Sequence, residues 1–183
     1  MNILKTKLNG VLVIEPDVYH DNRGWFFESW SKEKFCIDVD FVQDGHTYCA
    51  LKGTLRGIHF QKSPNAQSKL VRCTSGIILD AVVDIRMDSP TYCQYITVEL
   101  SRDNFKQLFI PKGFAHGFLT LTDNVEIQYK MDSSYVADSD RCIRWDDPSI
   151  DIKWSVENPI LSERDKIAPL LKDIDNNFMM ELT

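Results

Sequence analysis

The sequence has no cysteine pattern of the kind that a disulfide framework or a zinc knuckle requires. Its five cysteines, at positions 36, 49, 73, 93 and 142, are odd in number and include no Cys-x-x-Cys pair. Such a set is typical of a protein in a reducing compartment, so we expect a cytoplasmic location. The apolar stretch 11–14 is far too short for a signal or membrane segment, and we therefore expect no membrane partner.

Motifs of several common enzyme classes are also missing. There is no glycine-rich phosphate loop and no Gly-x-Ser-x-Gly turn, so no motif in the sequence supports nucleotide hydrolysis or acyl transfer. The histidines at 20, 46, 59 and 116 never occur as His-x-His or His-x-x-x-His, which removes the usual local spacing of a metal site but leaves a distributed site open. The formal charge of −6 argues against general nucleic-acid binding, so an anionic ligand would need a local basic site.

Short β-rich runs, separated by turn signals, recur along most of the chain. Turns such as Asp21-Asn-Arg-Gly24 and Pro111-Lys-Gly113 supply glycine, proline, asparagine and aspartate where a sheet must reverse. Many short strands without alternating helices favour an antiparallel sandwich or barrel of the jelly-roll type. A chain of 183 residues fits one domain, which we expect over residues 1–183. The expected strands are residues 11–14, 24–30, 40–43, 54–60, 69–73, 77–85, 94–100, 107–110, 114–121 and 124–130.

Two segments are predicted to be helical. Segment 31–37 begins with Ser31 as a capping residue, and segment 162–171 begins with Ser162 and acidic residues in its first turn. The tail, residues 172–183, mixes polar residues with one phenylalanine and two methionines. We expect this tail to dock on the body of the protein or on a neighbouring subunit.

The most informative stretch is 53–61, because it places a cation and an imidazole three residues apart on a predicted strand. Arg56 can hold a phosphate or carboxylate, and His59 can take up a proton near neutral pH. A regular strand would point these two side chains to opposite faces, but Gly57 between them would permit a bulge. The alternative is that Arg56 lies on a solvated face and His59 is a hydrogen-bonded core residue.

Three further residues interrupt apolar strand faces. Lys69 shares a face with Val71 and Cys73, and its alternative role is to protect a sheet edge. His116 alternates with two phenylalanines in the run 113–118 and should point into an aromatic-lined interior. Tyr129 ends an apolar row, where most tyrosines are core residues with a bonded hydroxyl.

Two carboxylates, Asp80 and Asp84, share one face of the apolar stretch 77–85. Buried carboxylates are costly unless they are paired or hydrogen-bonded, so we expect an arginine or a histidine nearby. Ion-pair anchors are at least as well supported here as substrate contacts.

Taken together, these runs belong to a longer series of ordered blocks that covers nearly the whole chain. The sequence resembles the dTDP-4-dehydrorhamnose 3,5-epimerase family of sugar-nucleotide epimerases. The blocks that carry the resemblance are residues 21–24, 41–44, 55–61, 69–72, 83–86, 89–91, 111–118, 129–130, 144–148 and 161–165.

The resemblance implies an all-β fold, an antiparallel double-stranded β-helix of the cupin-like jelly-roll type with short helices and a C-terminal helical tail. It implies that His59 is the general base, with Asp165 as its paired carboxylate, and that Tyr129 is the general acid on the opposite sugar face. Lys69 would stabilise an enolate, with His116 nearby. No metal or organic cofactor is required for this chemistry.

The resemblance also implies a nucleotide-sugar substrate, most specifically dTDP-4-dehydro-6-deoxy-D-glucose, converted to dTDP-4-dehydro-L-rhamnose by inversion of carbons 3 and 5. Some nucleotide contacts in the family come from a neighbouring subunit, so a homodimer is implied. Tyr135 matches the residue that stacks on the thymine base. The other positions that match substrate contacts are Arg23, Glu28, Gln43, Arg56, Asp140 and Arg164.

The chain departs from the family pattern at one place. The family sequence Gln-Asp-Asn-His-Ser reads Gln43-Asp-Gly-His-Thr47 here, with one extra residue before the Leu-Arg-Gly run, so Gly45 removes an amide side chain that is usually near the ligand. Two alternatives stay open. One is an epimerase of the same fold that inverts a single centre, and the other is a metal cupin or a sugar-binding module without turnover.

Overall fold

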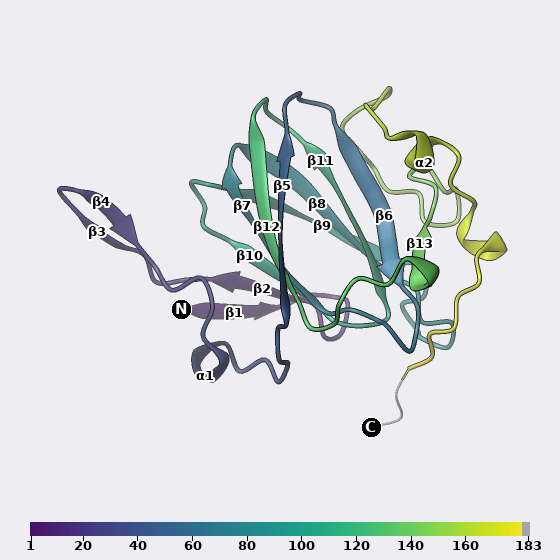
Figure 1. Cartoon of the computed structure of the whole chain (residues 1–183), viewed down its shortest axis with the longest axis horizontal. Helices are drawn as coiled ribbons and strands as arrows, with labels where there is room; N and C mark the ends of the chain where they lie inside the picture. The colour runs from purple at the N-terminus through teal and green to yellow at the C-terminus, as the bar shows by residue number, and fades with distance from the viewer. Residues whose placement is uncertain (181–183) are drawn as a thin grey trace.

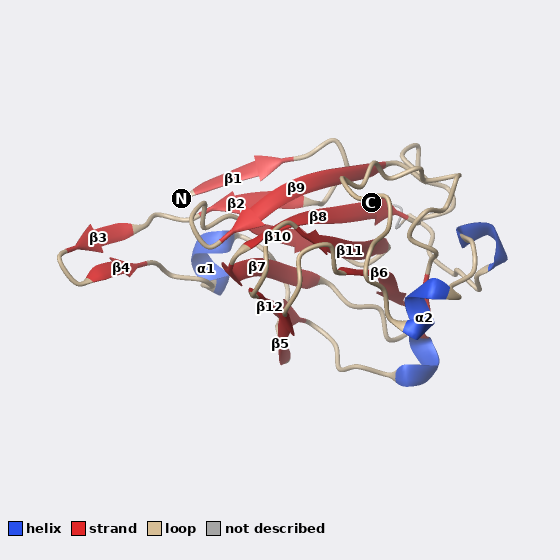
Figure 2. Ribbon diagram, turned by 90° about the horizontal axis from the view of Figure 1, so that it is seen from above, coloured by secondary structure: helices blue, strands red, loops and turns tan. Residues whose placement is uncertain are grey.

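The computed structural model describes residues 1–180, and it consists mainly of two large antiparallel sheets that face each other (Figures 1 and 2). The six-stranded sheet has the order β1-β2-β10-β7-β12-β5, and the five-stranded sheet has the order β13-β6-β11-β8-β9. This arrangement confirms the predicted all-β fold. The six strands of the first sheet are β1 (Asn2–Lys5), β2 (Leu12–Glu15), β10 (Gln107–Ile110), β7 (Lys69–Ser75), β12 (Val125–Met131) and β5 (Gln43–Cys49). Those of the second are β13 (Asp140–Cys142), β6 (Leu55–Gln61), β11 (Phe114–Thr120), β8 (Ile77–Asp84) and β9 (Tyr95–Ser101).

Strand alternation divides the apolar residues between the space inside the sandwich and its outer faces. Val82 packs between the sheets with Val71 and Ile127, whereas its neighbour Val83 faces outward. The outer face of the five-stranded sheet is covered by the chain after β13, including Phe178. Because both faces of this sheet are covered, β8 and β11 are buried along nearly their whole length.

The helices are short. Helix α1 (Lys32–Phe35) is capped by the Ser31 side chain, and α2 (Glu163–Lys166) is capped by Ser162, as the sequence predicted. Helix α2 forms only one turn because a proline follows three residues later, and a 3₁₀ turn, η2 (Leu171–Asp173), completes the segment. A second 3₁₀ turn, η1 (Ala137–Ser139), precedes β13. None of the helices within residues 1–180 is long or apolar enough to cross a membrane.

Three strands were not predicted, and one was misplaced. The unpredicted strands are β1, β13 and β3 (Tyr19–Asp21), which forms a separate hairpin with β4 (Gly24–Phe26). The strand expected at 40–43 begins only at Gln43 and runs to Cys49. Its inward positions are Gln43, Gly45 and Thr47, which line or approach a polar site, so the apolar alternation that marks a strand is missing.

The described part of the tail packs on the body of the protein. Phe178 is 7% exposed and its ring lies 6.0 Å from that of Phe60. The Phe178 carbonyl accepts a hydrogen bond from Met87 N, and Met180 N donates to Asp88 Oδ1 at 2.6 Å. Residues 181–183, the end of the predicted tail, lie outside the described residues.

Candidate active site

A β-bulge in β6 brings Arg56 and His59 to one cavity. His116 of β11 pairs with His59, but Phe118 pairs with Arg56, so two residues of β6 lie opposite one residue of β11. Gly57 has a φ of +119°, and a Cβ there would lie 2.6 Å from Gly117 Cα. The glycine therefore permits both the left-handed backbone and the close approach of β11, which confirms the predicted bulge.

The cavity has a volume of about 510 Å³, and its lining residues come from both sheets and from α2 and the segment that precedes it. Its size suits one small polar ligand. Apolar walls come from residues such as Leu55, Phe118 and Leu161. Seven of the predicted site residues line it: Arg56, His59, Lys69, His116, Tyr129, Arg164 and Asp165.

His59 is paired with a buried carboxylate that the sequence places 106 residues away. His59 Nε2 lies 2.7 Å from Asp165 Oδ1, and Asp165 is 2% exposed. The Asp165 backbone N–H donates to the capping oxygen of Ser162, which fixes the carboxylate at the start of α2. Burial alone would raise the pKa of Asp165, but hydrogen bonds from His59, Cys142 and Ser162 and the charge of His59 lower it to about 2. Asp165 is therefore an ionised acceptor that can orient the imidazole and stabilise its protonated form.

Cys142 also contacts the carboxylate of Asp165. Its Sγ lies 3.2 Å from Asp165 Oδ1, and burial, followed by the bond to Asp165, raises the pKa of the thiol far above its usual value. Among residues 1–180, His59, Cys142 and Asp165 form the one group of metal-ligand side chains whose atoms lie within 4.8 Å of one another. A metal at this position would have to bind a thiolate, whereas the thiol here is held protonated as a hydrogen-bond donor.

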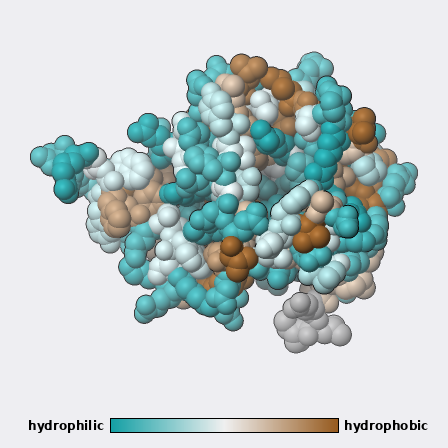
Figure 3. Space-filling model, in the orientation of Figure 1, coloured by the Kyte–Doolittle hydropathy of each residue, from teal (hydrophilic) through white to brown (hydrophobic). Residues whose placement is uncertain are grey.

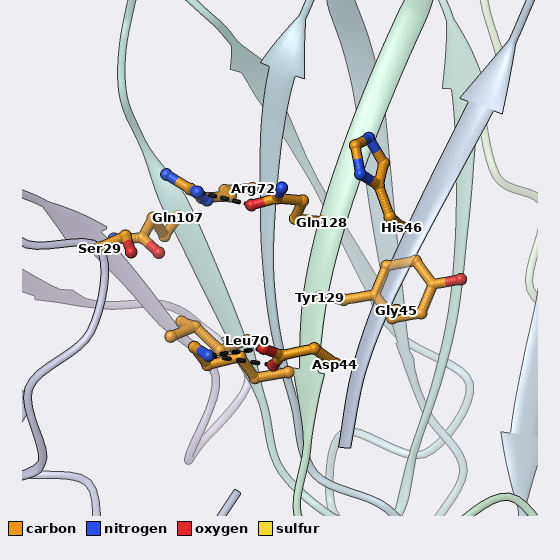
Figure 4. Close-up of a pocket in the computed structure, with 10 residues that line it drawn as sticks. Ser29, Asp44, Gly45, His46, Leu70, Arg72, Gln107, Gln128 and Tyr129 are labelled. Carbon is orange, nitrogen blue, oxygen red and sulfur yellow. Dashed lines mark hydrogen bonds and ion pairs between the residues drawn. The ribbon is translucent and has the colours of Figure 1, made fainter. Parts of the chain in front are cut away.

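Tyr129 approaches the cavity from the opposite sheet. Its hydroxyl lies 2.9 Å from Thr47 Oγ1, and its backbone pairs directly with Gly45 of β5. A Cβ at position 45 would lie 2.9 Å from ring atoms Cδ2 and Cζ of Tyr129, so the ring occupies space that a side chain at position 45 would need. Figure 4 shows the ring beside Gly45 with the hydroxyl pointing away from β12.

A second cavity, of about 340 Å³, lies on the other side of Tyr129 (Figure 4). Four of its polar residues form two pairs: Arg72 Nη2 donates to Gln128 Oε1 at 2.5 Å, and Lys130 Nζ lies 3.0 Å from Asp44 Oδ1. Tyr129 therefore lines both cavities and separates them.

Lys69 and His116 lie on the inner wall of the first cavity. Burial lowers the pKa of Lys69, and the negative charges of Asp140 and Asp80 oppose this effect. His116 Nε2 lies 2.9 Å from Asp80 Oδ2, so Asp80 has the histidine partner that the sequence predicted. Asp84 has its expected arginine, because Arg86 Nη2 donates to it at 2.7 Å.

Known proteins that are similar to this chain belong to one enzyme family. A family model described as dTDP-4-dehydrorhamnose 3,5-epimerase matches residues 5–173. The dTDP-4-dehydrorhamnose 3,5-epimerase of Shigella flexneri is 47% identical over 179 residues, which cover 96% of this chain and 98% of that protein. The chain belongs to the dTDP-4-dehydrorhamnose 3,5-epimerase family. This confirms the resemblance and makes the chain a member of a family of isomerases.

Solved structures of family members have the same fold. The enzyme from Bacillus anthracis, with TDP and pyrophosphate bound, is 45% identical with a TM-score of 0.90, and the match covers 92% of this chain and 98% of that one. The enzyme from Legionella pneumophila, in complex with dTDP-4-keto-L-rhamnose, is 41% identical with a TM-score of 0.90 and coverage of 95% and 94%. A 3'-monoepimerase from Streptomyces bikiniensis, in complex with dTDP-quinovose, is 31% identical with a TM-score of 0.86 and coverage of 91% and 86%.

Five of the predicted substrate contacts do not line the first cavity. Gln43, Tyr135 and Asp140 form a chain of hydrogen bonds that leads to it: Gln43 Oε1 accepts from Tyr135 N at 3.0 Å, and Asp140 Oδ2 accepts from Tyr135 Oη at 3.1 Å and from Arg164 Nη1 at 2.6 Å. Arg164 itself lines the cavity.

Arg23 and Glu28 lie elsewhere, on and beside the β3–β4 hairpin, which projects from the body (Figures 1 and 2). The side chain of Arg23 is 86% exposed and pairs with Asp21, and Glu28 pairs with Lys34. Figure 3 shows a hydrophilic tip on this projection, at the left of the view. Neither residue lines the cavity around His59 within this chain.

Two residues of the site were missed by reasoning from the sequence. Thr47 lies two positions after Gly45 and shares its face, so a correct prediction of strand β5 would have found it. Cys142 could be recognised only from the pairing of β13 with β6, which places it opposite His59. No local sequence signal reveals that pairing.

Proposed function

We propose that this chain inverts carbons 3 and 5 of dTDP-4-dehydro-6-deoxy-D-glucose to give dTDP-4-dehydro-L-rhamnose, without a metal or an organic cofactor. The observation that carries the proposal is the placement of a base and an acid on opposing sheets. His59, backed by ionised Asp165, belongs to the five-stranded sheet, and Tyr129 belongs to the six-stranded sheet. Both line one cavity that also contains Lys69.

The chemistry follows from the acidity of hydrogens next to a ketone. His59 Nε2 donates its hydrogen to Asp165, so Nδ1 is the nitrogen that removes the proton from carbon 3 or carbon 5, and the electron pair moves onto the oxygen of the carbon 4 ketone. Lys69 meets the negative charge that develops on this oxygen. Tyr129 then delivers a proton to the other face of the same carbon, which inverts it, and proton exchange with water restores both side chains.

Asp165 has the supporting role in this sequence of steps. A carboxylate with a depressed pKa stays ionised when His59 becomes protonated, so it stabilises the imidazolium that forms in the first step. Its bond to Ser162 and its position at the start of α2 keep the imidazole in one orientation.

The nucleotide part of the substrate needs a local positive site, because the whole chain has a net charge of −6. Arg56 and Arg164 supply guanidinium groups at the cavity, and the exposed ring of Tyr135 beside Asp140 offers a surface on which a base can stack. We assign the diphosphate to the arginines and the thymine to Tyr135.

We further propose a cytoplasmic homodimer with one domain per subunit. The projecting β3–β4 hairpin leaves Tyr19 and Phe26 each 64% exposed, which favours contact with a second copy of the chain. In such a dimer Arg23 and Glu28 would contact the nucleotide in the partner's cavity. All five cysteines are free thiols, as expected in a reducing compartment.

A single-centre epimerase is the second candidate, favoured by one comparison: the 3'-monoepimerase from Streptomyces bikiniensis has the same fold at 31% identity. The retention of His59, Tyr129 and Lys69 supports proton transfer but does not count the centres inverted. Conversion of carbon 3 alone would leave the sugar in a different configuration at carbon 5.

Proton NMR in deuterium oxide tests both candidates. The purified protein is incubated with dTDP-4-dehydro-6-deoxy-D-glucose, and the signals of the protons on carbons 3 and 5 are followed. We expect deuterium and inversion at both carbons. Inversion at one carbon would support the second candidate, and no exchange at either would refute the proposed function. Tyr129→Phe should retain exchange but slow inversion, because enolate formation does not require the phenol.

A further inference from the structure

Cys142 lies behind the His59–Asp165 pair, outside the proposed sugar site. It is the last residue of β13 and pairs directly with His59 of β6. Cys142 is 7% exposed, and its Sγ lies 3.2 Å from Asp165 Oδ1. The same oxygen lies 2.7 Å from His59 Nε2. One carboxylate oxygen therefore has two hydrogen-bond donors.

The direction of both bonds is fixed by the protonation of the groups. Burial raises the pKa of the Cys142 thiol far above its usual value, so the sulfur keeps its hydrogen and donates it. The pKa of Asp165 is lowered to about 2, despite the effect of burial, in part by the hydrogen bond from this thiol. The carboxylate can therefore only accept.

We propose that Cys142 is a positioning residue, which shares Asp165 Oδ1 with His59 and thereby limits how strongly the carboxylate holds the protonated imidazole. The thiol never touches the substrate and acts only through Asp165. This role rests on the proposed function, because it concerns the strength of His59 as a base.

Removal of the thiol should change activity at low pH in a definite direction. A carboxylate oxygen that loses one of two donors attracts the remaining donor more strongly. Without the thiol, the protonated form of His59 is stabilised and persists to higher pH. Because only the neutral imidazole can remove a proton, activity at low pH should then fall. A hydroxyl donates more strongly than a thiol and should have the opposite effect.

The other charged or titratable side chains around the pair do not change when residue 142 is replaced. Arg164 and Asp140 are paired with each other, and their charges act on Cys142 in opposite directions. The remaining groups that face the cavity are Arg56, Lys69, His116 and Tyr129.

The test compares Cys142→Ala with Cys142→Ser in the full-length protein. The two variants leave similar space and differ by one hydroxyl donor. The measurement is kcat/KM against pH for epimerisation of the same sugar nucleotide. We expect the acid limb of Cys142→Ala to move to higher pH by about half a unit, since the thiol is a weak donor and acts on His59 only through Asp165. Cys142→Ser should have its acid limb at or below the wild-type pH.

Matched controls come from Cys73, a second buried thiol, which donates to the Ser75 carbonyl at 3.1 Å and to the Gly76 carbonyl at 3.3 Å. Cys73→Ala and Cys73→Ser should keep the wild-type pH profile. If Cys142→Ala does not fold, Cys142→Val, which fills the space without a donor, carries the same prediction.

Coincident acid limbs for the alanine and serine variants at position 142, or a shift of both in the same direction, would overturn the proposal. An inactive wild-type protein would instead refute the proposed function. The two failures are therefore distinguishable.

Discussion

Two histidine–aspartate pairs lie side by side in the site. They have the same residue types but differ in exposure and in the pKa of the carboxylate. His59 and His116 are direct neighbours across β6 and β11, and their Nε2 atoms lie 2.7 Å and 2.9 Å from Asp165 and Asp80. The side chain of His59 is 30% exposed, whereas that of His116 is 10% exposed. The pKa of Asp165 is lowered to about 2, whereas burial raises that of Asp80.

The difference bears on which of the two similar pairs is better suited to supply a base. Asp165 has donors from His59, Cys142 and Ser162, so its charge is stabilised and available to a protonated imidazole. Asp80 is fully buried, and within residues 1–180 nothing donates to its second oxygen, Oδ1. Such a carboxylate resists ionisation and gives less support to a histidine that must gain a proton. Access to the cavity and a satisfied carboxylate, rather than the pairing itself, support the proposal that His59 is the base.

The sharpest way to break this comparison is to replace each histidine by asparagine. His59→Asn should lower turnover by about three to four orders of magnitude, near the upper range for removal of a general base, and abolish exchange at both carbons. His116→Asn should lower turnover by only about tenfold, because the residue lines the site without removing a proton. Turnover and deuterium exchange are measured for both variants. Equal losses, or a larger loss for His116→Asn, would mean that the roles of the pairs have been exchanged.

A smaller loss is expected from Lys69→Ala. Removing one donor from an oxyanion site typically costs about two to three orders of magnitude in turnover. Lys69 meets the enolate oxygen in the proposed mechanism, so its loss should slow inversion and exchange together. Lys130→Ala is the matched control, since Lys130 lies on the same sheet but pairs with Asp44 outside the first cavity. Near-normal turnover of Lys69→Ala would mean that this lysine has a structural role and does not stabilise the enolate.

Much of the fold could be predicted because inward and outward residues alternate along strands such as β8 and β12. The bulge at Gly57 could be predicted only as one of two alternatives, since Arg56 and His59 differ in parity and share a face only if the strand bulges. The site was less accessible to such reasoning. The pairing of His59 with Asp165 joins residues 106 positions apart, and only the family resemblance suggested it. Strand β5 was misplaced because its inward positions are polar, and the role of Cys142 depends on a strand of three residues.

The two aspartates should also differ in their effect on stability. The pKa of Asp165 is about 2 in the folded protein, below the ordinary value, so the carboxylate stabilises the fold above pH 4 and loses this contribution as the pH falls toward 2. Asp165→Asn should lower the melting temperature at pH 7 by about 5 °C, since hydrogen bonds to a charged group are lost. The loss should shrink as the pH approaches 2.

For Asp80 the sign is reversed. Its folded pKa is raised, so its ionised form destabilises the fold, and this penalty grows as the pH rises through the folded pKa. Asp80→Asn keeps an acceptor for His116 without a charge, and should therefore leave the melting temperature at pH 7 unchanged or raise it by about 2 °C. Thermal unfolding of both variants at several pH values is the measurement. Destabilisation of the same size in both would remove the distinction between the pairs.

The smallest expected effect is that of metal removal. The proposed steps move protons between His59, the sugar and Tyr129, and the enolate charge is met by Lys69, so no Lewis acid is needed. The one candidate group for a metal among residues 1–180 includes the Cys142 thiol, whose raised pKa opposes the deprotonation that metal binding requires. Turnover after exhaustive dialysis against EDTA should therefore equal that of the untreated protein, and addition of Zn²⁺ or Mn²⁺ should not increase it. If turnover disappears with EDTA and returns with a divalent metal, the base is a metal-bound species. The difference between the two histidine–aspartate pairs would then not explain which histidine removes the proton.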